Sequence, residues 1–190
     1  EYATLPLSLQ FLTLALLLIP VSLLMGKFGR KKIFILGVLS SLLGTFIVAF
    51  SIFDKNFMYF IVGSIFIGVS QATQQFYRYA AADNVPDNFK SKALSYVLAG
   101  GLIAAILGPE LSKISYTFLT EHIYLATYLI AGTVQILNLF VLAFLNIPKP
   151  KKNINIKRPL SEILFKKELI LAILSAALGF SLMSFIMTAT

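Results

Sequence analysis

The 190-residue sequence contains no cysteine, a single histidine and few charged residues. The lack of cysteine excludes a disulfide-stabilised scaffold and a thiol nucleophile, and one histidine cannot complete a metal set or an H-E-x-x-H motif. The Gly26-Lys27 pair is followed by Phe28 and has no glycine five residues earlier, so it is not a phosphate-binding loop. We therefore expect a non-enzyme that has no catalytic residue, no metal and no cofactor.

Charged residues make up 13% of the chain and hydrophobic residues 58%, whereas soluble domains have about 25% and about 45–50%, respectively. So few polar side chains cannot cover a water-facing surface, which excludes an ordinary soluble globule and a disordered chain. The apolar residues form six continuous runs, each near the roughly 20 helical residues that span a bilayer. The sequence therefore predicts an all-α, polytopic membrane helical bundle with six transmembrane helices. The expected helices cover residues 4–25, 31–53, 57–82, 92–114, 123–145 and 168–190.

The lysines and arginines gather in alternate connections between these helices. Fourteen of the sixteen lie in or beside the connections after the first, third and fifth helices, and only Lys55 and Lys113 lie on the opposite side. By the positive-inside rule, the stretches 26–32, 83–92 and 146–167 are cytoplasmic, in a multi-pass protein of the cell (cytoplasmic or inner) membrane. The net charge of +8 is therefore a topology signal, and the expected partner is the lipid bilayer, not nucleic acid.

Six crossings that start outside place both chain ends on the external side of the membrane. An external start at Glu1, which is not a methionine, requires an earlier span to carry it across, and the sixth helix stops at Thr190 without a polar flank. We therefore expect the sequence to be an internal fragment of a larger membrane protein.

A short basic hairpin joins the first two expected helices and reads GKFGRKK from Gly26 onward. Gly29 allows a turn that a larger residue would strain. The hairpin resembles the loop signature of the major facilitator superfamily, G-x-x-x-D-R-x-G-R-R/K, which lies between that family's second and third helices. Gly29, Arg30 and Lys31 match its second half, and Lys27 stands in for its first arginine. Gly26 replaces the aspartate that helps to latch the family's cytoplasmic side.

Three further stretches are similar to the same family. The family's link between its fourth and fifth helices resembles YRYAAADNVPDNFKSKALSYV. Its glycine-rich motif on the fifth helix, noted in exporters, resembles GGLIAAILGPELS. The end of its central linker resembles RPLSEIL. The resemblance covers the whole chain as the second to seventh of twelve helices. It implies that 1–145 is most of the N-terminal six-helix half, 146–167 the basic cytoplasmic linker, and 168–190 the first helix of the C-terminal half.

This resemblance implies a secondary transporter that moves a small-molecule solute by alternating access. The exporter-like Gly108-Pro109 pair favours efflux, H+ is the candidate coupling ion, and the full-length protein is expected to be monomeric. The alternative, from another functional class, is a non-transporting structural or assembly subunit of a membrane complex. The complete sequence distinguishes the two, because a transporter of this type adds one helix upstream and about five downstream, with a second half weakly similar to the first.

Polar side chains recur inside two of the expected helices. Gln71, Gln75 and Arg78 are spaced to share one face of the third helix, which makes them candidates for a solute pathway. The alternative for Arg78 is an ordinary arginine that snorkels to the cytoplasmic boundary. Gln135 and Asn138 lie three residues apart on the fifth helix and fit either solute contact or hydrogen bonding between helices.

The resemblance also implies a cytoplasmic gating motif that consists of Gly29, Arg30, Lys31 and Asp83. In the family, an acid at the position of Asp83 pairs with the arginine at the position of Arg30. Since Gly26 has replaced the family's aspartate, Asp83 is the acid left for this latch. The alternative is an exposed acid at a helix end without a specific partner.

Glu110 is the one carboxylate expected inside a span, which makes it a candidate proton-exchange site. Lys113 follows three residues later, so a simple helical ion pair is the alternative. Pro109 removes a backbone donor, and together with Gly108 it is expected to bend the fourth helix.

Overall fold

The computed structural model describes residues 4–83, 85–116, 118–119, 123–145, 147 and 167–189. The helices are α1 (Leu5–Phe28), α2 (Arg30–Asp54), α3 (Phe57–Gln74), α4 (Tyr77–Asp83), η1 (Asp87–Phe89), α5 (Lys90–Ser115), α6 (Leu125–Phe144) and α8 (Lys167–Ala189). The described ranges contain no strand, which confirms the all-α class. They divide into two compact units, Glu1–Pro150 and Lys151–Thr190, and α8 belongs to the second.

Five helical stretches of the described chain are long and apolar enough to cross a membrane. They are Leu5–Phe28, Arg30–Asp54, Phe57–Asp83, Asp87–Ser115 and Leu125–Phe144. The sixth expected span corresponds to α8, which has 23 residues and contains a shorter apolar stretch, Leu169–Gly179. The ends of the helices lie within a few residues of the predicted ranges.

The connection between α1 and α2 is tighter than the sequence predicts, since Gly29 alone separates the two helices. Gly29 has φ 90° and ψ 150°, a region that side chains with a Cβ do not readily adopt. Its N–H donates to the Met25 carbonyl at 3.0 Å and so closes the last turn of α1. The turn leaves Arg30 and Lys31 as the first two residues of α2.

The packing of α3 against α1 and α2 depends on small side chains at the crossings. A Cβ on Gly44 of α2 would lie 2.7 Å from the Gly63 carbonyl oxygen of α3, and a Cβ on Gly68 would lie 2.7 Å from the Gln10 carbonyl oxygen of α1. The backbones therefore approach each other closely, as is common where small residues line contacts between membrane helices.

The span expected over 57–82 is present as Phe57–Asp83, but Gln75 and Phe76 form a turn that divides it into α3 and α4. The Thr73 hydroxyl donates to the Ser70 carbonyl at 2.7 Å, and the Phe76 N–H donates to the Thr73 carbonyl at 3.1 Å. A hydroxyl that bonds the preceding turn competes with the regular ladder, and the i to i−3 bond tightens the chain. The interruption spans these two residues, after which α4 begins at Tyr77.

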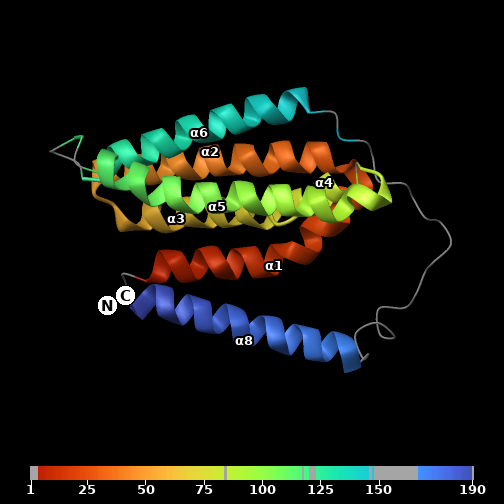
Figure 1. The fold of residues 1–190 in the computed structure, drawn as a ribbon. Coiled ribbons are helices and arrows are strands. Elements are labelled where there is room, and N and C mark those ends of the chain that lie inside the picture. The colour runs from red at the N-terminus through yellow and green to blue at the C-terminus, as the bar shows by residue number, and fades with distance from the viewer. Residues whose placement is uncertain are drawn as a thin grey trace. The chain divides into compact units, whose positions relative to one another are not determined.

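The main hydrophobic cluster lies near the start of α2, where α1, α2, α3, α4 and α6 meet. Its buried members are Val21, Met25, Ile33, Phe34, Val38, Ala72, Ala80 and Leu142. The Phe34 and Tyr77 rings meet edge to face, with their centroids 4.6 Å apart. Within the first unit, α6 packs along α2, and Figure 1 shows α6 and α3 on different sides of α2.

Candidate solute pathway and cytoplasmic hairpin

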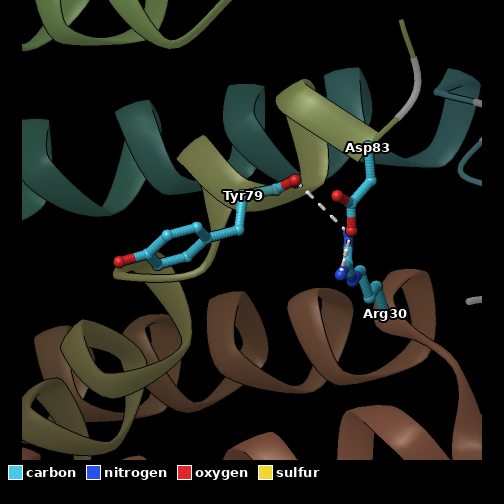
Figure 2. Close-up of polar contacts among 3 residues, drawn as sticks. All are labelled: Arg30, Tyr79 and Asp83. Carbon is cyan, nitrogen blue, oxygen red and sulfur yellow. Dashed lines mark hydrogen bonds and ion pairs between the residues drawn. The ribbon is translucent and has the colours of Figure 1, made fainter. Parts of the chain in front are cut away.

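The ion pair predicted between Arg30 and Asp83 is present in the structure. Figure 2 shows the Asp83 carboxylate, at the end of α4, facing the Arg30 guanidinium at the start of α2. Arg30 Nη1 also donates to the Tyr79 carbonyl at 3.4 Å, while the Tyr79 ring points away from the pair. The Arg30 side chain is 21% exposed and the Asp83 side chain 53% exposed. The pair is thus open to water on its acidic side, where solvent and salt weaken it.

Lys31 makes a contact that the sequence does not reveal. Its Nζ donates to the Ala143 carbonyl of α6 at 2.8 Å, across 112 positions of the chain. Sequence reasoning placed Lys31 in the hairpin motif, but its partner is a backbone atom, and backbone atoms carry no signature in the sequence. The sequence holds one weak signal of this contact: α6 has no basic residue in its own last turn, so its C-terminal carbonyls lack a cation from their own helix.

A turn at Gln75 and Phe76 separates the candidate pathway residue Gln71, on α3, from Arg78, on α4. Gln71 Oε1 is buried and has no hydrogen-bond partner among the described residues. Arg78 Nε is likewise buried and without a partner there, although the guanidinium lies 4.9 Å from the centre of the Tyr79 ring. Gln75, in the turn itself, is exposed.

Gln135 and Asn138 bond to each other on α6. Asn138 Nδ2 donates to Gln135 Oε1 at 3.4 Å, and both side chains are half-buried. The Tyr77 hydroxyl of α4 lies near the Asn138 side chain, is buried, and forms no well-aligned hydrogen bond within the described chain. Tyr77 is not among the candidate pathway residues that the sequence predicts.

Gly108, Pro109 and Glu110 lie on the exposed surface of α5. Pro109 is accommodated inside the helix, which runs unbroken to Ser115. Lys113 Nζ donates to Glu110 Oε1 at 2.9 Å, so the helical ion pair considered for Glu110 is present.

A half-open pocket of about 470 Å³ lies between α5 and α6. It brings together two residues singled out from the sequence, Gly108 and Gln135. Its lining is mostly apolar, with polar groups from Ser112, Ser115 and Thr127. The Ser115 and Thr127 hydroxyls lie 2.9 Å apart and join the two helices. The described residues contain no group of three acidic, histidine or cysteine side chains that could hold a metal ion.

Comparison with known proteins identifies the family. The sequence profile of the Major Facilitator Superfamily matches residues 1–190. The chain is also 36% identical over 190 residues to the riboflavin transporter RfnT of Brucella anthropi, an alignment that covers 98% of this chain and 48% of that protein. The chain thus spans about half the length of this relative. No solved structure matches the sequence of this chain. The sequence match and the all-α membrane architecture agree, and the chain belongs to the Major Facilitator Superfamily.

Proposed function

We propose that the full-length protein is a secondary transporter that moves a small solute across the cytoplasmic (inner) membrane by alternating access. Residues 1–145 would supply most of its N-terminal half, and the connections 26–32, 83–92 and 146–167 would face the cytoplasm. The observation that carries this proposal is the family match over residues 1–190, supported by the similarity to a riboflavin transporter.

Riboflavin is the first solute to test. It combines a flat apolar ring system with several hydrogen-bond donors and acceptors, and solute sites of this kind join apolar walls to a few polar groups. The side chains proposed to contact the solute are Gln71, Arg78, Gln135 and Asn138, with Gln75 at the cytoplasmic turn. They are polar groups within or at the ends of apolar membrane spans.

Gln71 and Arg78 are the best supported of these residues. A buried polar atom without a partner costs about 1–3 kcal/mol, and polar groups in membrane spans commonly face a cavity or a transport path. Gln71 Oε1 and Arg78 Nε are two such atoms. Water or solute would supply the missing partners when the pathway opens.

The test is exchange of labelled for unlabelled riboflavin by the purified full-length protein in proteoliposomes, which reports transport whichever direction the cell uses. Wild-type protein should take up labelled riboflavin into vesicles preloaded with unlabelled riboflavin, and Gln71→Leu should reduce the initial uptake about tenfold, because a lost polar contact to solute costs on the order of 1.4 kcal/mol. Thr133→Val is the matched control, since Thr133 is exposed and its hydroxyl bonds within its own helix to the Leu129 carbonyl. Normal uptake by Gln71→Leu would remove Gln71 from the pathway. No uptake by well-expressed wild type would reject riboflavin as the solute.

The hairpin of Gly29, Arg30, Lys31 and Asp83 is proposed to stabilise one of the two access states. The Arg30–Asp83 pair supports this role, because it ties the start of α2 to the end of α4 on the cytoplasmic side.

Proton coupling is proposed to run through Glu110, and the Gly108-Pro109 step would serve as a bend during gating, with efflux as the direction. The Glu110→Gln variant in proteoliposomes tests the coupling: solute movement driven by a pH gradient should fall, while exchange of labelled for unlabelled solute continues. Equal pH-driven rates in Glu110→Gln and wild type would exclude Glu110 from coupling.

A further inference from the structure

Three cations, Arg30, Lys31 and Lys32, occupy the first turn of α2, which contains no acidic residue. The N-terminus of a helix carries a partial positive charge, so cations there are destabilising for their own helix, by up to about 1 kcal/mol each at exposed positions. A topology signal alone requires only that these charges lie in the cytoplasm. It does not explain why they sit inside the helix rather than in the connection before it.

The ends of two other helices lie at this same place. α4 and α6 have no basic residue in their own last turns. The last four carbonyls of a helix lack partners within the helix, and the C-terminus carries a partial negative charge that favours a nearby cation. Both C-termini therefore lack the compensation that a lysine or arginine usually supplies.

The first two cations of α2 contact these two helix ends from outside. Arg30 donates to the Tyr79 carbonyl of α4 at 3.4 Å and pairs with Asp83. Lys31 donates to the Ala143 carbonyl of α6 at 2.8 Å. Lys32 is exposed, and the structure records no polar contact for it within the described residues. Arg30 and Lys31 are thus unfavourable for the N-terminus of α2, but they stabilise the C-terminal ends of α4 and α6.

We propose that Lys31 is a positioning residue that caps α6 from α2 and so fixes the point at which α6 ends. In sequence, α6 leads directly into the basic stretch 146–167. The consequence for transport rests on the proposed function: a link from the hairpin to α6 would couple movement of α2 to movement of α6. The capping itself does not depend on which solute the protein carries.

Hydrogen–deuterium exchange on the purified full-length protein in lipid nanodiscs tests the proposal. The reporter amides lie in the last turn of α6, where the Leu145 N–H donates to the Val141 carbonyl at 3.1 Å. Lys31→Met should speed their exchange about three- to tenfold, the size expected for loss of a charged bond at a helix end. Lys32→Met is the matched control and should leave the exchange unchanged. Lys31→Arg keeps a cationic donor and should restore protection.

The outcomes separate this proposal from the proposed function. Faster exchange confined to the end of α6 in Lys31→Met, with rescue by Lys31→Arg, supports the cap even if riboflavin is not transported. Unchanged exchange in Lys31→Met overturns it, whatever the uptake assay gives. Equal acceleration in Lys32→Met, or acceleration throughout the bundle, also overturns it, because the effect would then be general to charge removal or to folding.

Discussion

The contact between Gly44 and Gly63 gives a sharp test of how α2 and α3 pack. Replacing Gly44 with alanine would place a Cβ 2.7 Å from the Gly63 carbonyl oxygen and 3.0 Å from both the Ile67 backbone nitrogen and Ile67 Cγ1. Ordinary contacts of a Cβ lie at 3.4–4 Å. Two of these three atoms belong to the backbone, so no change of rotamer relieves the clash, and the two helices must separate.

The magnitude follows from two opposing effects. Inserting a methyl group into a well-packed contact costs about 1–3 kcal/mol, and alanine is favoured over glycine within a helix by about 1 kcal/mol. The expected net destabilisation of Gly44→Ala is the difference between them, up to about 2 kcal/mol. Gly132→Ala is the control, because a Cβ there would meet Thr45 Cγ2 at an ordinary 3.7 Å. Gly132→Ala has the same gain in helix propensity but does not introduce the clash.

The assay is thermal unfolding of the purified full-length protein, followed by loss of monomeric protein on size-exclusion chromatography. Gly44→Ala should lower the apparent Tm, whereas Gly132→Ala should leave it unchanged or raise it. A Tm of Gly44→Ala equal to or above that of wild type would refute the close backbone approach. A large fall in Gly132→Ala would show that α6 is more tightly packed against α2 than the 3.7 Å contact implies.

Two further predictions concern the candidate site. Arg30→Ala and Asp83→Ala should each reduce the initial transport rate of the full-length protein, and the swap Arg30→Asp with Asp83→Arg should recover part of it; full transport by both single variants would contradict a functional pair. Gln71→Cys, in a chain that lacks native cysteine within residues 1–190, should react with a membrane-impermeant polar thiol reagent in at least one access state. Complete protection in every state would place Gln71 in packed protein.

Composition predicted the all-α membrane architecture because apolar length is a property of whole segments, while the orientation indicated by charge placement stays a prediction. Apolar length determines where a chain can cross a bilayer, and the distribution of lysine and arginine orients the crossings. These rules average over many residues, so a local irregularity in one helix does not change the predicted number of spans. Except at the break between α3 and α4, the expected helix ends therefore lie within a few residues of those observed.

The break between α3 and α4 could not be predicted in this way. It depends on the Thr73 hydroxyl, which bonds the Ser70 carbonyl at 2.7 Å and lies where a Cβ on Gly37 would be. The sequence shows neither that Thr73 faces Gly37 nor that its hydroxyl turns toward the preceding carbonyl. The one-face pattern of Gln71, Gln75 and Arg78 stays a prediction, and the turn at Gln75 and Phe76 interrupts the helix along which that spacing is counted.

The Arg30–Asp83 pair was predictable, whereas the Lys31 contact was not, and the difference lies in their partners. Arg30 meets an acidic side chain, whose charge is visible in the sequence and whose place in a family motif suggests the pairing. Lys31 meets a backbone carbonyl, and only the arrangement of α2 and α6 determines which carbonyl it reaches. The positive-inside rule treats Arg30, Lys31 and Lys32 as equivalent charges. Their contacts show that they are not, because the first two each bond a carbonyl near the C-terminal end of another helix and the third is exposed to solvent. A cation that contributes to topology is therefore free to contribute to packing as well, and its distance to a helix end decides whether it does.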